Sequence, residues 1–504
     1  MILSSLLNRF SEPETLKMAK LGRELRAQGI DVIDLSLGEP DFDTPQHIKD
    51  AAIKAIHDNW SHYTPVAGFL DLREAVCSKL KRDNNLEYKP EQIVTSTGAK
   101  QSLANAILAL VDEGDEVIIP TPYWVTYSEL VKIARGKVIE IRTTTEAGFK
   151  ATPAQIEAAI TPKTKVFMFS SPCNPSGAVY SKDELKALAD LFKKYPHITI
   201  LSDEIYEYIN FIGKHESIAQ FSDIKDQIVV INGLSKGFAM TGWRLGYTAS
   251  SVEIAKAMEK LQGQFTSGTC SITQKAAVTA LVGDLKPSLE MTEEFTRRRA
   301  TTLKLVSEVP GFKCYAPEGA FYVFPDVSSY FGKSDGTQTI ANAADFSMYL
   351  LNTAHVSSVM GDAFGEPNCV RFSFANSMTN IERAWARIKE ALGTVGESLS
   401  DNIMLLENPA NSAVLDLQNM LENQMDRLST TRGTLRQLNK DDKSGVANIS
   451  NANIALAEDN VAAARRLNEL ELSTFLAGLT EAELAAIGAT NDLTDEMEDM
   501  IATQ

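Results

Sequence analysis

Up to about residue 392, the sequence predicts a doubly wound α/β domain with a mostly parallel sheet, followed by a smaller α+β domain. Short apolar runs rich in β-branched residues alternate with longer helical patterns. This alternation is typical of crossover units whose helices cover both faces of a parallel sheet. The chain has 504 residues, 44% of them hydrophobic, which is more than one core usually holds, so two or three domains are expected.

The predicted elements follow one another in a regular order. Strands are expected at 91–96, 115–120, 164–171, 197–203 and 227–235, with helices at 99–111, 127–134 and 182–194. A longer helix at 286–309, strand-like runs at 315–326 and 368–376 and a closing helix at 378–393 predict the smaller domain. We therefore expect an N-terminal arm and part of the small domain at 1–45, a large domain at 46–285 and the small domain at 286–393.

Residues 394–504 predict an acidic, all-α extension of a different character. From Glu397 onward there are 7 Lys and Arg against 19 Asp and Glu, a net of −12, against 42 and 47, or −5, before it. Apolar residues seven apart, from Val414 to Leu435, have companions that are half polar, so a weak coiled coil and a helical hairpin fit equally. We expect a module for assembly or for docking a protein partner, or a fused segment of separate origin.

Composition excludes several classes of function. The net charge of −17 argues against a nucleic-acid partner, because duplex binding requires a basic surface. The apolar runs are shorter than a membrane span requires, and the N-terminus lacks a secretory signal, so a cytoplasmic location is expected. Five scattered cysteines without a CxxC pair predict neither a disulfide framework nor a zinc site, and no metal is expected.

Polar residues follow the apolar runs at the places where the predicted strands end. Trp124, Asn174, Asp203 and Lys236 each occupy such a position. Open α/β sheets bind ligands outside the carboxyl ends of their strands. These four side chains are therefore expected to meet in one crevice.

The stretch SKGFAMTGWRLGY, which begins at Ser235, places Lys236 directly after a strand. A lysine held in a crevice near other cations can lose its proton and form a Schiff base with a carbonyl, as pyridoxal 5'-phosphate requires. Alone, the lysine fits an ordinary glycine-rich turn better. The other requirements of that cofactor decide between the two interpretations.

Two further motifs carry the groups that the cofactor ring requires. Asp203, at the end of ITILSD, can keep the ring nitrogen protonated, so that the ring withdraws electrons. Asn174 in SSPCNPSG and Tyr206 in SDEIYEY can reach the phenolic oxygen. Trp124 in PTPYW is the candidate for stacking on the ring, with core packing as an equal alternative.

A phosphate cradle is predicted at STGAKQ, between a strand and a helix. Gly98, Ala99 and Lys100 can offer backbone N–H groups and the positive end of the helix to a phosphate. Ser235 and Arg244 would add a hydroxyl and a charged fork. The signal is weak by itself and gains weight from the lysine and aspartate motifs.

With these motifs in this order, the sequence resembles the class I aminotransferases of fold type I. SSPCNPSG, SDEIYE, SKGFAMTGWRLGY and VRFSFA carry the resemblance, which covers about residues 5–392. SLGEPDFDTP and HYTPVAGFLDLREAV resemble the bacterial aspartate aminotransferases, in the branch that lacks the second substrate arginine of the animal enzymes. The extension after Gly393 lies outside the resemblance.

The resemblance implies a role for each matching residue. Lys236 would hold the cofactor and move the substrate proton, with Asp203 on the ring nitrogen and Asn174 and Tyr206 on the phenolic oxygen. Trp124 would stack on the ring. Ser235, Arg244 and the amides of Gly98 and Ala99 would hold the phosphate.

The resemblance also implies how the substrate is bound and how the chain assembles. Arg371 in VRFSF would grip the substrate α-carboxylate, with Gly38 approaching the same end. Lys100 would face the distal carboxylate of aspartate or glutamate. Tyr63 in HYTPVAG would reach the phosphate of a neighbouring subunit, which implies a homodimer with shared active sites.

The expected reaction is transamination between L-aspartate and 2-oxoglutarate, giving oxaloacetate and L-glutamate. Prephenate, an aromatic amino acid or alanine stay open as alternative substrates, because pocket size is not visible in the sequence. A pyridoxal enzyme that eliminates or decarboxylates would share the cofactor residues. A regulator on the same fold would carry a basic N-terminal domain, whereas here the appendage is acidic and C-terminal.

Overall fold

The computed structural model describes residues 3–335 and 338–395. The chain divides into two compact units, Met1–Asn402 and Ile403–Gln504, and the described residues all belong to the first. The predicted helices and the assembly or partner-docking role of the extension fall outside the described residues. They stay predictions.

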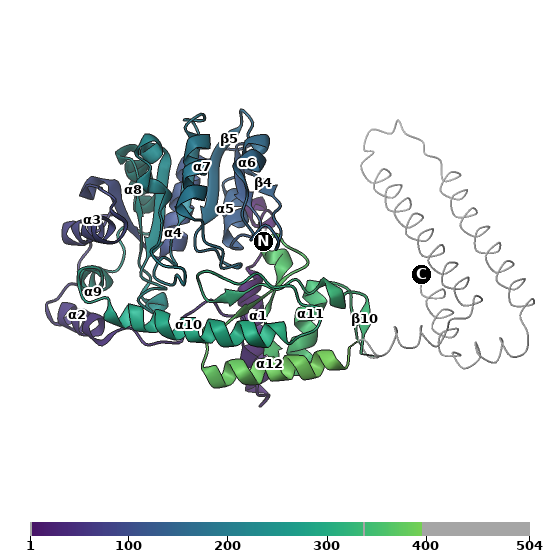
Figure 1. The fold of residues 1–504 in the computed structure, drawn as a ribbon. Coiled ribbons are helices and arrows are strands. Elements are labelled where there is room, and N and C mark those ends of the chain that lie inside the picture. The colour runs from purple at the N-terminus through teal and green to yellow at the C-terminus, as the bar shows by residue number, and fades with distance from the viewer. Residues whose placement is uncertain (1–2, 336–337, 396–504) are drawn as a thin grey trace, which may run out of the picture. The chain divides into compact units, whose positions relative to one another are not determined.

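The large domain is built on a seven-stranded sheet with the order β2-β8-β7-β6-β5-β3-β4 (Figure 1). Strands β7, β6, β5, β3 and β4 are parallel neighbours, whereas β8 is antiparallel to both β7 and β2. The predicted mostly parallel sheet is therefore confirmed, with one reversed strand. The bounds are Ile93–Ser96 (β2), Glu116–Pro120 (β3), Lys137–Ile141 (β4), Thr164–Ser170 (β5), Thr199–Asp203 (β6), Ile228–Gly233 (β7) and Gly246–Ala249 (β8).

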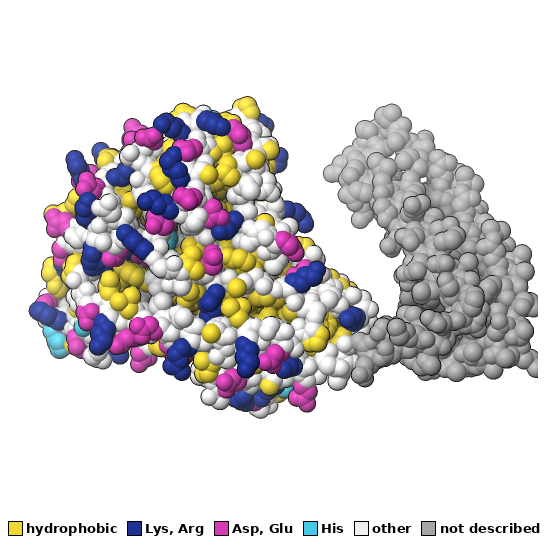
Figure 2. Space-filling model, in the orientation of Figure 1, with side chains coloured by type: hydrophobic (Ala, Val, Ile, Leu, Met, Phe, Trp, Pro, Cys, Tyr) yellow, Lys and Arg dark blue, Asp and Glu magenta, His cyan; other side chains and the backbone are white. Residues whose placement is uncertain are grey.

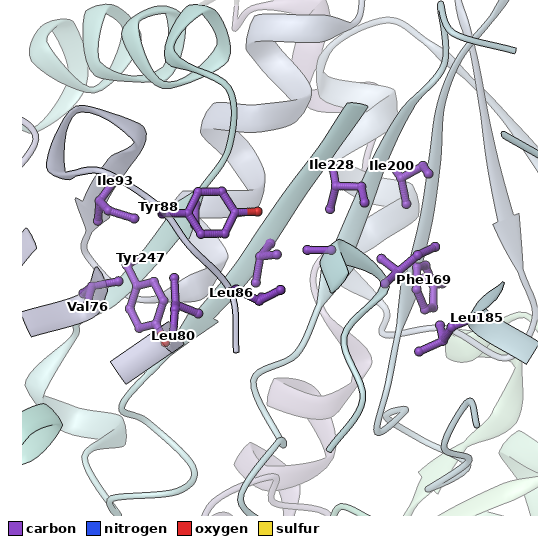
Figure 3. Packing of buried hydrophobic residues seen from close by; sticks show 14 of the residues in the cluster. Val76, Leu80, Leu86, Tyr88, Ile93, Phe169, Leu185, Ile200, Ile228 and Tyr247 are labelled. Carbon is purple, nitrogen blue, oxygen red and sulfur yellow. The ribbon is translucent and has the colours of Figure 1, made fainter. Parts of the chain in front are cut away.

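Successive residues of the central strands pack on opposite faces of the sheet. Ile200 and Ile228 belong to the buried cluster shown in Figure 3, together with side chains of α3 and α7. The next residues along the same strands, Leu201 and Val229, pack with α4, α5 and α8 on the other face. Because strand side chains alternate between faces, a strand covered on both sides must be apolar throughout, as these runs are.

The helices of the large domain divide between these two faces. Side chains of α4, α5 and α8 join one cluster, and those of α2, α3, α6, α7 and α9 join the other. Their bounds are Gln46–His57 (α2), Leu70–Asn84 (α3), Ala99–Leu110 (α4), Thr126–Ile133 (α5), Pro153–Ala159 (α6), Lys182–Phe192 (α7), Val252–Phe265 (α8) and Ser271–Val282 (α9).

Local sequence signals explain where several helices begin. Before α7, the Ser181 hydroxyl accepts from the Glu184 N–H at 3.3 Å, and the Glu184 carboxylate accepts from the Ser181 N–H at 2.7 Å. Thr152 and Gln155 form the same reciprocal cap before α6. Each such cap satisfies two backbone donors that the first helical turn leaves unpaired.

The small domain combines short strands with four helices. Strands β13, β14 and β9 form an antiparallel sheet, and β1 pairs with β12 in parallel. Helices α10 and α12 pack along this domain (Figure 1). The bounds are Glu14–Ala27 (α1), Lys286–Ser307 (α10), Ala343–Tyr349 (α11), Met378–Gly393 (α12), Ile33–Asp34 (β1), Tyr322–Val323 (β9), Lys333–Ser334 (β10), Thr339–Ile340 (β11), Val356–Ser357 (β12), Val359–Met360 (β13) and Val370–Ser373 (β14).

The strand-like run predicted at 315–326 is mostly not a strand. Only Tyr322–Val323 is assigned as one. Before it, the backbone N–H groups of Glu318 and Gly319 both donate to the carbonyl of Gly177, at 2.8 and 2.9 Å, in the large domain. These bonds tie the run to a loop of the neighbouring domain instead of to a strand partner.

The described surface carries charges of both signs. Figure 2 shows Lys and Arg side chains interspersed with Asp and Glu over the visible face, with apolar side chains between them. Among the described helices, none combines the length and apolar character that a membrane span requires.

Candidate active site

The carboxyl ends of β2, β3, β5, β6 and β7 lie at one edge of the sheet, because these strands share a direction. Lys236 follows the end of β7 by three residues. Its ammonium donates to the carbonyl oxygen of Gly38 and lies 5.7 Å from the ring centre of Tyr206 and 5.8 Å from that of Phe321. The lysine therefore lies where the large domain meets the N-terminal arm and the small domain.

The surroundings of Lys236 favour its neutral form. Burial, followed by the positive charges of Arg371 and Arg244, lowers the pKa of the Lys236 amine to about 8, against the opposing charges of Glu39 and Asp203. An amine that gives up its proton near neutral pH is a nucleophile and a base.

Asp203, the last residue of β6, is buried at 4% exposure. Its Oδ2 accepts from the hydroxyl of Tyr127 at 2.6 Å and its Oδ1 from the N–H of Ile205 at 3.2 Å. Burial raises the pKa of the Asp203 carboxyl to about 6, although the two hydrogen bonds and the charge of Lys236 oppose this shift. A buried carboxylate with two donors and no cation in direct contact among the described residues is suited to receive a cationic group.

This environment predicts a stability effect of Asp203→Asn in the cofactor-free protein. The folded pKa of about 6 lies above the ordinary value, so the stability that Asp203 contributes is complete below about pH 4 and is lost as the pH rises through 6. The amide carries no charge, so the variant should be about 1–2 kcal/mol more stable at pH 7, after the loss of one accepted hydrogen bond. Urea unfolding at pH 4 and pH 7 measures the difference.

The gain should disappear near pH 4. The matched control is Asp223→Asn, because Asp223 is paired with Lys193 on the surface and that pairing lowers its pKa. Its variant should show no gain at pH 7. Equal stability of wild type and Asp203→Asn at pH 7 would contradict the assigned environment.

Residues predicted for the phosphate cradle meet at the start of α4. Gly98 precedes the helix with φ of +83°, and a Cβ atom there would lie 2.4 Å from Nη2 of Arg244. Only glycine therefore allows the guanidinium to pack on this turn. Nη1 of Arg244 donates to the carbonyl of Thr241 at 2.7 Å, which holds the fork in place. Gly98, Ala99 and Arg244 are thus brought together. Ser235, the residue before Lys236 in the chain, is buried.

Lys100 and Trp124 meet next to this cradle. The Lys100 ammonium lies 4.9 Å from the ring centre of Trp124. Partial burial, followed by the charge of Arg244, lowers the pKa of Lys100. The Trp124 ring contacts Tyr127 edge-on, with ring centres 5.8 Å apart. A cation and a flat aromatic face are therefore available at the same place.

Arg371 is buried at 1% exposure in the middle of β14. Its Nη1 donates to Oδ1 of Asn174 at 2.9 Å and its Nη2 to the carbonyl of Ser36 at 2.5 Å. Its Nε is buried without a hydrogen-bond partner among the described residues. Burial lowers the pKa of Arg371. Two neutral oxygens hold the fork, so its charge remains to be balanced by an anion.

Tyr206 lies in the crevice, whereas Tyr63 does not. The Tyr206 hydroxyl is 2.7 Å from that of Tyr322, and its ring is close to Lys236 as described above. Gly38 is also in place, since a Cβ atom there would meet the Tyr322 hydroxyl at 2.5 Å. Tyr63 is 99% exposed. Lys100 and Arg244 are also exposed, but each lies against another predicted site residue, Trp124 and Gly98 respectively.

Sequence reasoning missed two residues of this site. Tyr127, which bonds Asp203, comes three residues after Trp124 in PYWVTY, and its position after a strand end was a usable signal. Tyr322 carries no such signal, because its run reads as ordinary core.

Comparison with known proteins decides which family this site belongs to. Residues 30–388 match the family model described as aminotransferase class I and II. The chain belongs to this family. It is an aminotransferase that uses pyridoxal phosphate and takes amino and 2-oxo acids as substrates.

Relatives of this aminotransferase match over nearly their whole length. The aspartate aminotransferase of Bacillus subtilis is 45% identical over 391 residues, which is 77% of this chain and 98% of the relative. The aspartate/prephenate aminotransferase of Nitrosomonas europaea is 44% identical over 396 residues, covering 78% and 100%. The solved aspartate aminotransferase of Rhizobium meliloti aligns with a TM-score of 0.76 at 40% identity, covering 79% of this chain and all of that one.

The residues of the aminotransferase site fit pyridoxal phosphate. The turn at Gly98 has room for a guanidinium because a Cβ atom is absent, and backbone N–H groups at a helix start bind phosphates. Asp203 is a buried carboxylate without a direct cation among the described residues, as a pyridinium partner requires. The Lys236 amine interacts electrostatically with both Arg244 and Asp203 and has a lowered pKa.

Proposed function

We propose that this aminotransferase transfers the amino group of L-aspartate to 2-oxoglutarate, giving oxaloacetate and L-glutamate. The observation that carries the proposal is a pair of cations, Arg371 and Lys100, that form no ion pair with any described carboxylate. Both substrates and both products are dicarboxylates. Two cations without a carboxylate partner in the protein can each bind one carboxylate of such a substrate.

The charges of the site support this assignment when each is given one partner. Lys236 forms the covalent link to the cofactor, and Arg244 lies at the phosphate cradle. Arg371, whose fork is held by Asn174 and Ser36, is left for the α-carboxylate. Lys100, next to Trp124, is left for the distal carboxylate. Charge-assisted bonds of this kind are the strong ones, and bidentate geometry adds selectivity.

The proposed mechanism assigns one task to each group. When bound, pyridoxal phosphate supplies an electron-withdrawing ring that stabilises negative charge at the substrate α-carbon. The Asp203 carboxylate would hold the ring nitrogen in its protonated form, while Asn174 and Tyr206 would contact the phenolic oxygen. The amine of Lys236 would take the proton from the substrate α-carbon and deliver it to the cofactor carbon. Orientation by Arg371 and Lys100 keeps the reacting atoms within reach of that amine.

The substrate assignment is tested by rates with 2-oxoglutarate and a panel of amino donors, aspartate, phenylalanine and alanine, and by rates with prephenate as the amino acceptor and L-aspartate as the donor. Aspartate should have the highest kcat/KM. Lys100→Met should lower kcat/KM for aspartate by roughly 10- to 100-fold, because a charged partner of the distal carboxylate is lost. The rate with alanine should change little, because alanine has no distal carboxylate.

The control for Lys100→Met is Lys193→Met, which removes a surface lysine paired with Asp223. It should leave the whole panel unchanged. An equal loss for aspartate and alanine in Lys100→Met would contradict the assigned role of Lys100 without affecting that of Arg371.

Prephenate, a 2-oxo acid, is the second candidate amino acceptor. Prephenate also carries two carboxylates, so the same two cations suit it, and relatives such as that of Nitrosomonas europaea are named aspartate/prephenate aminotransferases. Comparable kcat/KM values for prephenate and 2-oxoglutarate as acceptors of the amino group of L-aspartate would assign both reactions to this enzyme.

We also propose that two copies of the chain form a homodimer with shared active sites. Tyr63, the expected phosphate contact from a neighbouring subunit, is 99% exposed. Exposed large apolar side chains lie on α2, at the start of α3, at the end of α8 and at the end of α9, and α2 and α3 both pack against α9. Exposed apolar groups that gather in this way mark interaction surfaces. They are Ile53, Ile56, Trp60, Leu70, Phe265 and Val282.

A mixing experiment tests the shared site. Lys236→Ala and Tyr63→Ala are each expected to have low activity as pure dimers. A mixed dimer has one site with both defects and one with neither, so dissociation and reassembly of the two variants together should restore up to about half of the wild-type activity per mixed dimer. Mixing Lys236→Ala with Asp203→Ala is the control, since those residues lie in the same copy and restore nothing. Absence of recovery in a verified mixed dimer would contradict the proposal.

The cytoplasmic location expected from the sequence stays a prediction.

A further inference from the structure

Tyr322 contacts both Arg371, the proposed clamp for the substrate α-carboxylate, and Tyr206, the proposed contact of the phenolic oxygen. It is the first residue of β9 and has 0% exposure. Its hydroxyl lies 2.7 Å from that of Tyr206, and its ring centre lies 4.5 Å from Cζ of Arg371. No other described tyrosine contacts both of these residues.

Hydrogen-bond capacity restricts what the two hydroxyls can do together. A tyrosine hydroxyl has one donor and two acceptor positions. Burial raises the pKa of Tyr206 well above its ordinary value and also raises that of Tyr322, so both hydroxyls keep their protons. If Tyr206 donated to Tyr322, it would have no proton left for a cofactor oxygen. If Tyr322 donates to Tyr206, the proton of Tyr206 is free to point into the site.

We propose that Tyr322 is a positioning residue with two separate functions. Its hydroxyl directs the proton of Tyr206 toward the phenolic oxygen of the cofactor. Its ring packs against the Arg371 guanidinium and holds it in place. The inference rests on the roles proposed above for Tyr206 and Arg371. It adds a residue that couples the cofactor contact to the substrate clamp.

The packing around Tyr322 supports this role. A cation placed over an aromatic face is attracted by it, more strongly when water is excluded, and Arg371 is buried here. The Tyr322 hydroxyl also excludes any side chain at Gly38, where a Cβ atom would lie 2.5 Å away. The carbonyl of the same glycine accepts a hydrogen bond from the Lys236 ammonium.

The hydroxyl function is tested with Tyr322→Phe, which keeps the ring. The readout is the pH midpoint of the visible absorbance of the bound cofactor in the full holoenzyme. Weaker donation from Tyr206 leaves more negative charge on the phenolic oxygen, which favours the proton on the adjacent nitrogen that links Lys236 to the cofactor. The midpoint should therefore rise by roughly 0.3–1 pH unit.

Two companion variants separate the possible outcomes. Tyr206→Phe should raise the midpoint by at least as much, and adding Tyr322→Phe to it should cause no further rise, because Tyr322 acts through Tyr206. No shift in Tyr206→Phe would overturn the proposed role of Tyr206. A shift in Tyr206→Phe with none in Tyr322→Phe, or full additivity of the two, would overturn the inference on Tyr322 alone.

The ring function is tested with succinate, a dicarboxylate that cannot react. Tyr322→Leu should weaken succinate binding by roughly 2- to 30-fold, whereas Tyr322→Phe should leave it within about twofold because the ring remains. Equal weakening in both variants would overturn the assignment of ring and hydroxyl to separate functions.

The matched control is Tyr330→Phe, in the same domain. Tyr330 is buried and its hydroxyl donates to the carbonyl of Pro310 at 2.7 Å, away from the site. Its variant should lose stability without moving the absorbance midpoint or the succinate affinity. A midpoint shift in Tyr330→Phe as large as that in Tyr322→Phe would mean that both report only a general loss of packing, and would overturn the inference.

Discussion

Replacing Lys236 with alanine is expected to abolish transamination, with a loss in kcat of at least about 10⁴-fold, because both the covalent attachment and the proton transfer depend on one amine. The visible absorbance of the covalently held cofactor should disappear at the same time. The pKa of about 8 makes Lys236 able to act in both steps near neutral pH. Steady-state assays and absorbance spectra of the purified holoenzyme measure the two effects.

Lys236→Arg separates chemistry from charge. Arginine keeps a cation near the Gly38 carbonyl but stays protonated, so it cannot serve as nucleophile or base. It should therefore be as inactive as Lys236→Ala. Activity of either variant within tenfold of wild type would contradict the assigned role, whereas Lys193→Ala, at an exposed ion pair, should behave as wild type.

Replacing Lys79 with methionine is expected to produce the largest loss of stability. Lys79, on α3, is 1% exposed and forms an ion pair with Glu207, itself 6% exposed. It also donates to Oδ1 of Asn84 at 2.9 Å, and Asn84 donates to Glu207 at 3.2 Å. Removing the ammonium leaves a buried carboxylate without its cation, which costs about 3–5 kcal/mol.

The double variant Lys79→Met/Glu207→Met tests this reason. Taking away both charges removes the uncompensated carboxylate, so most of the lost free energy of unfolding should return. Denaturant unfolding of the cofactor-free protein provides the comparison. Lys186→Met, which breaks an exposed pair with Asp190, should cost less than about 1 kcal/mol. A similar loss in the Lys186 and Lys79 variants would contradict the importance of burial.

The pair also links stability to the site. Glu207 lies four residues after Asp203, in the turn that continues through Tyr206. Its partner Lys79 comes from a helix on the outer layer, more than a hundred residues earlier in the chain. Packing of α3 on the sheet therefore helps to hold the segment that carries Asp203 and Tyr206.

Local patterns were enough to predict most elements and the outline of the site. The closing helix is predicted at 378–393 and observed at Met378–Gly393, because its apolar periodicity and its Ser377 cap are both local signals. The central strands are predicted within a few residues, since runs that are apolar on both faces are distinctive. Lys236 and Asp203 could be placed together because parallel strands end at one edge.

Contacts between distant segments could not be predicted in the same way. Tyr322 meets Tyr206 across 116 positions of sequence, and Tyr127 meets Asp203 across 76. Nothing in the local pattern of a buried tyrosine indicates which hydroxyl it will face. The prediction of a strand at 315–326 was mostly wrong for the same reason, because backbone groups of this run bond to the other domain.

The sequence by itself determined the α/β architecture, the edge of the sheet where chemistry occurs and the residue types gathered there, since these follow from periodicity and from the direction of the strands. Tertiary structure decided that β8 runs in the reverse direction, after the turn in which Arg244 packs on Gly98 as predicted. It likewise decided that Tyr322 lies between Arg371 and Tyr206, and that Tyr63 is left on the surface. The physical reason is that side-chain periodicity encodes which face of an element is buried, whereas the partner of a buried polar group depends on how separate elements pack.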